Sequence, residues 1–363
     1  MKNFKLTKYI EIKKIEKRII ANEKPVTVCV DAMGGDYGPE PVLDGILQAL
    51  HAKPNLSILV AGDPAIIDPL CSEYERLTAL PCTETIGMDE HPAEVVHAKK
   101  DSSIVKGCKA VNKGNADAFF SAGATGAIFT AATLNVGRAK DIKRPALAAI
   151  LPGKKGHQTV FLDLGANADL RSDVYPQLAA MGSALYHTYV QDKNCRVGLL
   201  SNGTEDTKGS EHTLQAFAEL KNTQKDSGFT FVGNVEGNDL LLGDCDVVVA
   251  SGLLGNVALK CMEGAVKYAV YFLKQNAAKA PWRALGLLLC SHRFKKMGYD
   301  LSGEAYGGAF LLGLRNPVVV GHGKTSAKAV KNGIIAAAEM VEKGLCKSVE
   351  KELSTKEITE EQR

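Results

Sequence analysis

The chain has 363 residues, of which 45% are hydrophobic and 23% charged, so it holds enough apolar material for one large or two modest folded domains. This composition excludes intrinsically disordered, collagen-like and coiled-coil proteins. The net charge is only +3, and residues 1–24 alone carry eight Lys/Arg against three Glu, which leaves the remainder at −2. A body without excess positive charge argues against nucleic acid as a partner, because neutralising phosphates supplies most of that affinity.

Targeting and redox signals are also sparse. No run of about 18 apolar residues occurs, which excludes a transmembrane helix on length. Residues 1–24 lack the apolar core and cleavage site of a secretory signal, so they are interpreted as a solvated basic tail, as the product of an upstream start codon, or as a surface-binding arm. The nine cysteines form no C-x-x-C pair and no zinc-like cluster with the eight histidines. Most are therefore expected to be core thiols in a reducing compartment, with no metal site.

From residue 25 onward, short β-branched runs alternate with amphipathic stretches of helical length, a pattern typical of an α/β fold with a largely parallel sheet. No linker separates two halves, so a second layer is expected to be interleaved rather than appended, and residues 347–363 are expected to fray. The predicted strands cover 26–31, 56–61, 117–121, 146–151, 159–163, 196–200, 230–232, 246–250 and 318–321. The predicted helices cover 40–51, 93–112, 127–136, 174–190, 210–220, 255–274 and 326–343.

Five glycine-bearing turns follow predicted strands, at the edge where open α/β sheets bind ligands. Glycine lets backbone N–H groups approach an anion at a helix N-terminus, so a phosphate-bearing ligand is expected, although any single loop can also be only a tight turn. None of these turns matches the dinucleotide or P-loop fingerprint. They are DAMGGDYGPE (31–40), SAGATG (121–126), DLGAN (163–167), SNGTEDTKG (201–209) and SGLLGN (251–256).

Individual side chains in these turns allow two interpretations each. Lys208 precedes a predicted helix, where its charge opposes the helix dipole, so it either binds an anion or is a solvated lysine beside neighbouring carboxylates. Asn256 either caps a helix or donates a hydrogen bond to an oxygen that gains charge during a reaction. Ser121 and Thr125 either cap a helix or bind phosphate oxygens. His322 is either an acid/base group or structural.

Residues 279–299, KAPWRALGLLLCSHRFKKMGY, differ from the rest of the chain because large apolar side chains alternate with basic ones and no acidic residue occurs from 281 to 298. This segment is interpreted either as a buried helix with an exposed basic end or as an interfacial segment on anionic lipid. The side chains expected to contact a membrane or an acidic partner are Trp282, Arg283, Leu288, Arg293, Lys295 and Lys296.

Nine motifs in the chain closely resemble, in order and spacing, those of the bacterial acyl-acyl-carrier-protein:phosphate acyltransferases, the PlsX family. The likeness runs from about Val26 to Leu345. The motifs are DAMGGDYGP, SAGATGA, RPAL, DLGAN, GLLSNGTEDTKG, GNVEG, DVVVASGLLGNVALK, YGGAFLLG and HGKTS.

This resemblance implies a Rossmann-like layered α/β/α fold, similar to isocitrate and isopropylmalate dehydrogenases and phosphotransacetylases, with a protruding helical tip at about residues 275–300. It implies one catalytic domain at 25–346, between a basic extension (1–24) and a charged tail (347–363). The implied protein is a cytoplasmic homodimer that associates peripherally with the inner face of the cell membrane. It would transfer a fatty acyl group from acyl carrier protein to inorganic phosphate, without a metal or cofactor. The acyl-phosphate product would supply phosphatidic acid synthesis through a glycerol-3-phosphate acyltransferase.

The resemblance also assigns site residues. Lys208 and Asn256 match the positions regarded as catalytically essential in the family, so the resemblance implies that they are the catalytic residues here. The expected phosphate- and substrate-binding residues are Asp31, Gly34, Gly35, Asp36, Ser121, Gly123, Thr125, Gly126, Asn167, Thr204, Ser251, Gly252 and His322.

Three positions depart from the family pattern: Ala124 replaces Asn, Ser251 replaces Asp, and Asn238 replaces Arg. Each lost buried hydrogen bond would weaken phosphate binding by about 1–3 kcal/mol. Two alternatives therefore stay open, a phosphotransacetylase-like enzyme that uses acyl-coenzyme A and a catalytically weakened scaffold that binds acyl carrier protein at the membrane. A metal-dependent hydroxy-acid dehydrogenase is disfavoured, because the sequence has neither clustered Asp ligands nor a nucleotide fingerprint.

Overall fold

A computed structural model describes residues 24–190, 195–224, 228–277, 281–301 and 305–354. The predicted basic extension, up to residue 23, and the last part of the tail, 355–363, lie outside these ranges. The described chain forms two compact units, one made of residues up to Gly137 together with Asn316–Gly344, the other of Arg138–Arg315 together with the segment from Leu345. The chain thus passes between the units three times, so the two units are interleaved along the sequence.

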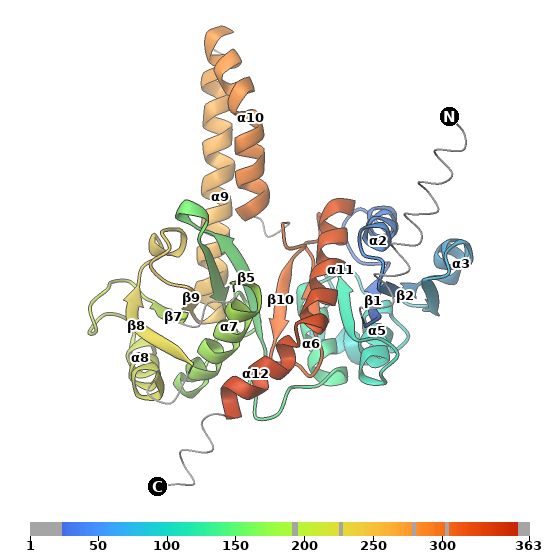
Figure 1. Ribbon diagram of the computed structural model, residues 1–363, viewed down its shortest axis with the longest axis horizontal. Helices are drawn as coiled ribbons and strands as arrows, with labels where there is room; N and C mark the ends of the chain where they lie inside the picture. Colours follow the sequence, from blue (N-terminus) through green and yellow to red (C-terminus); the bar gives the residue numbers. More distant parts are fainter. Residues whose placement is uncertain (1–23, 191–194, 225–227, 278–280, 302–304, 355–363) are drawn as a thin grey trace. The chain divides into compact units, whose positions relative to one another are not determined.

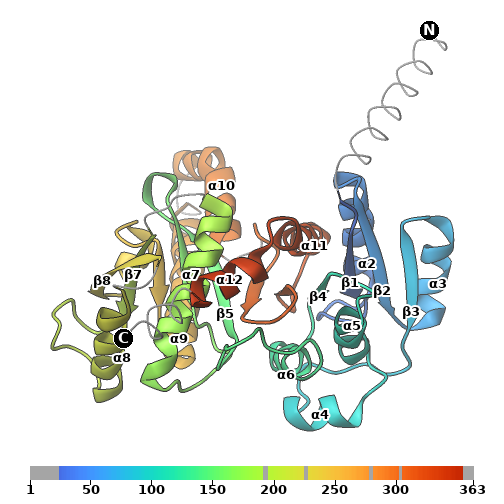
Figure 2. The same cartoon turned by 60° about the horizontal axis from the view of Figure 1, so that its bottom comes forward.

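The first unit contains a fully parallel sheet in the order β3-β2-β1-β4-β11. In Figures 1 and 2, α2 and α11 lie on one side of this sheet and α5 and α6 on the other. Its strands are β1 (Val26–Asp31), β2 (Leu56–Gly62), β3 (Leu77–Pro81), β4 (Ala118–Ser121) and β11 (Val318–Val320). Its helices are α2 (Glu40–Ala52), α3 (Pro64–Glu73), α4 (Pro92–Ala98), α5 (Ser103–Asn112), α6 (Thr125–Asn135) and α11 (Ala327–Glu342).

The second unit contains a mixed sheet in the order β10-β5-β6-β9-β7-β8. β5 is antiparallel to β10 and β6, whereas β6, β9, β7 and β8 are parallel, so their carboxyl ends share one edge. The strands are β5 (Ala146–Pro152), β6 (Gln158–Leu162), β7 (Cys195–Leu200), β8 (Phe229–Val235), β9 (Val247–Val249) and β10 (Ala309–Leu312). The helices are α7 (Tyr175–Val190), α8 (Glu211–Thr223), α9 (Gly252–Ala277), α10 (Pro281–Leu301) and α12 (Leu345–Ser354), with 3₁₀ turns at Lys154–Gly156, Ser172–Val174 and Asp239–Leu241.

The expected helical tip is present as α9 and α10, which lie side by side and project from the second unit (Figure 1). Trp282, Leu288 and Leu289 on α10 are 72%, 68% and 76% exposed. The interpretation of this segment as a buried helix is therefore wrong. None of the helices described is both long enough and apolar enough to cross a membrane.

Three other expectations need correction. The single helix predicted at 93–112 is two helices, because Ser102 accepts a hydrogen bond from the Val105 N–H and starts α5 anew. Fraying is wrong for residues 347–354, which belong to α12, where Leu345 and Val349 are buried and the helix packs on α7. β3, β10, α3 and α12 were not predicted, and α3 carries a proline inside the helix that interrupts its pattern.

The expectation of core thiols is confirmed for most cysteines. Five of the nine are buried, and burial raises the pKa of the Cys195 thiol to about 12. The buried five are Cys29, Cys82, Cys108, Cys195 and Cys245.

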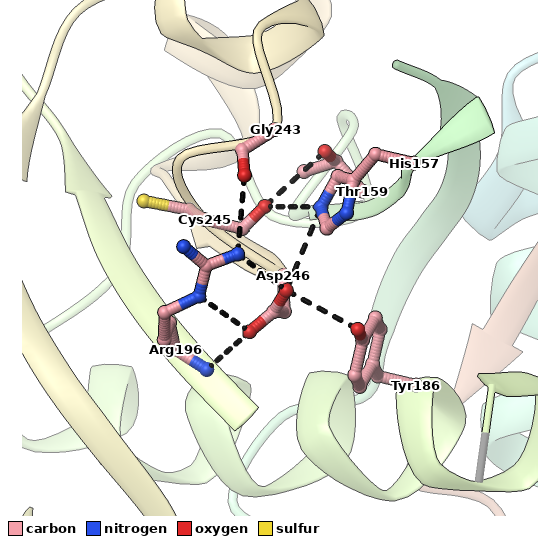
Figure 3. A network of polar contacts seen from close by, with 7 residues as sticks. All are labelled: His157, Thr159, Tyr186, Arg196, Gly243, Cys245 and Asp246. Atoms are coloured by element: carbon pink, nitrogen blue, oxygen red, sulfur yellow. Dashed lines mark hydrogen bonds and ion pairs between the residues drawn. The ribbon is translucent and has the colours of Figure 1, made fainter. Parts of the chain in front are cut away.

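The amino edge of the second sheet is fastened by Asp246, just before β9 (Figure 3). This buried carboxylate accepts hydrogen bonds from the Arg196 backbone N–H (2.7 Å) and from the Arg196 guanidinium (2.9 and 3.0 Å). The Tyr186 hydroxyl donates to it from 3.2 Å, and His157 Nε2 lies 3.5 Å away. Burial alone would raise the pKa of Asp246, but the hydrogen bonds from Arg196 outweigh burial and leave it below its ordinary value.

Candidate functional site

In the second unit, the loop after β6 is organised by Asp163, which is fully buried. Its carboxylate accepts four hydrogen bonds of 2.8–3.1 Å, from the N–H groups of Leu147, Ala166 and Asn167 and from the Asn167 side-chain amide. Burial raises the pKa of Asp163 although these hydrogen bonds act to lower it. Sequence reasoning did not single out Asp163, yet an aspartate directly after a buried strand and before glycine was a usable signal.

Asn167 faces inward rather than toward a ligand. It is buried, and its side-chain amide donates both to Asp163 and to the Pro145 carbonyl, at 2.9 and 2.8 Å. Asn167 therefore joins the β6 loop to the residue before β5 and positions it, and its expected contact with phosphate stays a prediction.

The N-terminus of α9 lies against this loop. The helix begins at Gly252, three residues earlier than predicted, and the Ser251 hydroxyl accepts a hydrogen bond from the Leu254 N–H at 3.4 Å. The Gly252 N–H donates to the Asn167 carbonyl (3.0 Å), and a Cβ at Gly255 would lie 1.9 Å from the Asp163 carbonyl oxygen. Gly252 and Ser251 thus build the turn, and their expected direct contact with substrate is not supported by this geometry.

Asn256 is not the cap of α9, because it lies inside the first turns of the helix. Its side chain is exposed and makes no hydrogen bond within the described chain. A Cβ at Gly165, where φ is +112°, would lie 3.6 Å from the Asn256 Cγ, so the amide stands directly over the β6 loop. Asn256 therefore does not cap α9, and its amide is accessible to a ligand.

Lys208 lies in the loop between β7 and α8, at the same sheet edge as Asn256. The Asn234 side chain fixes this loop by donating to the Glu205 carbonyl at 2.9 Å. The Lys208 side chain is half exposed, and its ammonium is 4.0 Å from the exposed Glu205 carboxylate. An ion pair this long and exposed contributes little, so the Lys208 charge stays available to an anion. Thr204 is exposed in the same loop.

In the first unit, Asp31 and Ser121 hold the loops after β1 and β4 together. Asp31 is buried and accepts hydrogen bonds from the Ser121 hydroxyl (2.6 Å) and the Met33 N–H (3.0 Å). The Gly123 N–H donates to the Ser121 oxygen at 3.0 Å. Burial raises the pKa of Asp31. In this geometry Asp31, Ser121 and Gly123 hydrogen-bond to one another's loops and position them, and their contact with phosphate stays a prediction.

Glycines and an exposed histidine complete this edge. A Cβ at Gly34 would lie 2.7 Å from the Gly123 nitrogen, and Gly35 has φ +107°, so both positions need glycine. The Asp36 N–H donates to the Gly323 carbonyl at 2.7 Å and ties the β1 loop to the β11 loop. His322 is exposed, and its Nδ1 accepts from the Lys324 N–H at 3.3 Å.

The start of α6 corrects another expectation. Ala124 occupies the N-cap position and gives no side-chain hydrogen bond, so neither Ser121 nor Thr125 caps the helix. The first N–H groups of a helix have no acceptor within it, so those at this end of α6, where Thr125 is exposed, have hydrogen-bonding capacity that an anion could use.

The expected site residues thus fall into two groups, one in each unit, and the structure describes each group within its own unit. The residues that face outward are Asp36, Thr125, Thr204, Lys208, Asn256 and His322. On the hairpin, which is the pair of helices α9 and α10, the exposed residues include Arg283, Arg293, Lys296, Trp282 and Leu288. The side chain of Lys295 lies outside the part of the chain described.

Comparison with known proteins adds the family. A family model described as "Fatty acid synthesis protein" matches residues 26–348. A phosphate acyltransferase of Campylobacter fetus subsp. fetus is 39% identical over 331 residues, which cover 91% of this chain and 98% of the relative. A phosphate acyltransferase of Limosilactobacillus reuteri is 40% identical over 342 residues, with 93% and 99% covered.

Solved structures confirm the fold class. EutD phosphotransacetylase from Staphylococcus aureus superposes with a TM-score of 0.55 at 16% identity, covering 92% of this chain and 98% of that one. A branched-chain phosphotransacylase from Enterococcus faecalis V583 gives 0.56 at 14% identity, covering 87% and 99%. At these identities the likeness concerns the fold alone.

Proposed function

We propose that this chain, which belongs to the phosphate acyltransferase family, transfers a fatty acyl group from acyl carrier protein to inorganic phosphate and makes acyl-phosphate for phospholipid synthesis. One observation carries the proposal. Asn256 presents an exposed amide that its helix does not need as a cap, at the same sheet edge as the available Lys208 ammonium. A hydrogen-bond donor beside a cation suits a reaction in which a carbonyl oxygen becomes negative and the attacking group is an anion.

Direct acyl transfer needs few chemical groups from the protein. Phosphate is already a nucleophile at neutral pH, so Lys208 and the N–H groups of its loop need only hold it beside the thioester carbon. Asn256 and the first-turn N–H groups of α9 then donate to the oxygen of the tetrahedral species. The thiol leaves as a thiolate, which a pKa of about 8.5 permits without a strong acid.

The exposed surface of α9 and α10 suggests where the enzyme acts. We propose that α9 and α10 place the enzyme on the cytoplasmic face of the membrane as a peripheral homodimer, and that a glycerol-3-phosphate acyltransferase takes over its acyl-phosphate. The proposal is supported by exposed apolar side chains on both helices, among them Tyr268, Phe272 and Leu289, together with exposed Arg283 and Arg293.

An assay of phosphate-dependent thiol release from palmitoyl-acyl carrier protein tests the activity. We expect release by the wild type and by Lys100→Ala, which removes an exposed lysine of the first unit, and almost none by Lys208→Ala. Equal release by wild type and Lys208→Ala would refute the mechanism. Release from acyl-coenzyme A alone would identify a phosphotransacetylase, and carrier binding without any release would identify a scaffold.

Liposome flotation with anionic vesicles tests the membrane contact. We expect Leu288→Glu to reduce the floating fraction, whereas Leu134→Glu, an exposed leucine on α6 of the first unit, should leave it unchanged. Unchanged flotation of Leu288→Glu would count against the hairpin as the membrane anchor. Analytical ultracentrifugation of the wild type measures the expected dimer.

A further inference from the structure

A basic cavity of the second unit plays no part in the mechanism above. It has a volume of about 440 Å³ and lies where the chain enters β5, beside the turn that leads to α7. Three cationic and two acidic side chains line it, so it carries a net positive charge. Its lining residues are Lys143, Arg144, Asp169, Leu170, Arg171, Asp173 and Val174.

Arg144 is the available cation of this cavity. Lys143 and Arg171 both pair with Asp173, at 2.8 and 3.2 Å, and the Lys143 hydrogen bond lowers the pKa of Asp173, which therefore remains ionised. Arg144 is exposed and has no hydrogen bond or ion pair with any residue that the structure describes. A guanidinium in this position can donate two parallel hydrogen bonds to a phosphate-type oxyanion.

The cavity adjoins the catalytic edge but is separated from it. The carbonyl of Pro145, next to Arg144, accepts from Asn167, and the Ala168 carbonyl accepts from the Leu253 N–H at 3.3 Å. The segment from Asn167 to Asp169 therefore lies between the cavity and the first turn of α9, which carries Asn256. An anion held by Arg144 would therefore lie across this segment from Asn256.

We infer that this cavity binds the phosphodiester of the pantetheine arm that carries the acyl thioester, with Arg144 as its main ligand. The inference rests on the proposed function. Attacking phosphate must reach the thioester carbon beside Asn256, whereas the pantetheine chain separates the phosphodiester of the donor from its thioester by many bonds. An anion beyond the 167–169 segment thus suits the arm better than the attacking phosphate.

A neighbouring depression supports this assignment. It has a volume of about 640 Å³, shares Lys143 with the cavity, and adds Arg138, Lys140 and Arg315 to the basic surface against Asp141 and Glu350. The phosphodiester joins the arm to the carrier protein, which is acidic. The body of the carrier protein would therefore lie on a basic surface that continues from the phosphodiester site.

Steady-state kinetics with three donors test the inference. For Arg144→Ala we expect KM for palmitoyl-carrier protein and palmitoyl-phosphopantetheine to rise about tenfold, the size of one lost charged hydrogen bond, with Arg144→Lys in between. KM for palmitoyl-pantetheine, which has no phosphate, and KM for inorganic phosphate should not change. Lys154→Ala, which removes a charge at the far end of β5, should behave as wild type. A higher KM for phosphate, or an equal loss with all three donors, would overturn the inference.

Binding without turnover separates this inference from the proposed function. By fluorescence anisotropy, the wild type should bind carrier protein that bears the pantetheine arm more tightly than carrier protein without it, and Arg144→Ala should lose most of that difference. A difference that persists in Arg144→Ala would reject the inference even if the enzyme is active. Suppose instead that the wild type transfers no acyl group but still binds the carrier protein with its arm more tightly, and that Arg144→Ala loses this preference. That result would reject the proposed function alone.

Discussion

Each edge of the second sheet holds a buried aspartate, and the pKa values of these two aspartates are shifted in opposite directions. At the amino edge, Asp246 is paired with the Arg196 cation, and its pKa is below the ordinary value. At the carboxyl edge, Asp163 accepts hydrogen bonds only from neutral N–H groups among the described residues, and burial keeps its pKa above the ordinary value. The amino edge uses its cation to hold strands together. At the carboxyl edge, Lys208 has one long ion pair and Arg144 has no partner among the described residues, and both charges are proposed to bind ligands.

The largest effect is expected from removing the exposed amide at the carboxyl edge. Asn256→Ala should lower kcat about a hundred- to a thousand-fold, the typical loss for one oxyanion donor. Its free energy of unfolding should change by no more than about 0.5 kcal/mol, since the side chain is exposed and does not cap α9. Thiol-release kinetics and urea unfolding measure both quantities. A large loss of stability would show that Asn256 is structural after all.

A substitution at the amino edge should instead lower stability and leave activity unchanged. Asp246→Ala leaves the Arg196 N–H and the Tyr186 hydroxyl without their acceptor, so we expect the free energy of unfolding to fall by about 3 kcal/mol. kcat of the protein that remains folded should be unchanged. Asp244→Ala, which removes an exposed carboxylate two residues away, is the control and should have little effect on either quantity.

The pH dependence of stability should separate the two aspartates by sign. The folded pKa of Asp246 is depressed, so its contribution is present above the unfolded value of about 3.9 and is lost as the pH falls toward the folded value. The folded pKa of Asp163 is raised, so its contribution is present below about 3.9 and is lost as the pH rises through the folded value. Urea unfolding at several values from about pH 3 to about pH 6 measures both effects. We expect Asp246→Asn to remove the loss of stability at falling pH, and Asp163→Asn to remove the loss of stability at rising pH. The reverse pattern would contradict both assignments.

The smallest effect concerns the carboxyl edge of the first unit. Ala124 sits at the N-cap of α6 without a capping side chain, so Ala124→Asn should raise the free energy of unfolding by about 1 kcal/mol. Ser326→Ala, which removes the cap of α11 in the same unit, should lower it by a similar amount. If Ala124→Asn also raises activity, this position affects phosphate binding as well as the helix.

The sequence predicted which loops lie at the carboxyl edges of the sheet, but it did not predict which side chains of those loops point outward. Glycine turns after buried strands predicted the carboxyl edges, and both Lys208 and Asn256 lie there. Asp31 points inward because the Met33 N–H of its own loop needs an acceptor, whereas Asn167 points inward because its side-chain amide donates to Asp163 and to the Pro145 carbonyl. No local pattern separates such a residue from one that faces a ligand.

Two further limits have specific causes. The start of α9 was predicted three residues late because Gly252 and Gly255 are poor helix formers, and both are required by the close approach of the Asp163 and Asn167 backbones. The composition of residues 279–299 predicted a helix that carries both large apolar and basic side chains. Whether that helix is buried depends on tertiary packing, and only the exposure of Trp282 and Leu289 decided it.

The position of α12 also bears on how the protein is made. Leu345 and Val349 complete the packing on α7, a helix that is synthesised more than 150 residues earlier, by the residue numbers of the two elements. During translation, part of the apolar face of α7 therefore stays exposed until residues 345–354 have left the ribosome. A nascent chain in this state is a natural client for chaperones, and a premature stop before residue 345 would leave a product that aggregates although every proposed catalytic residue is present.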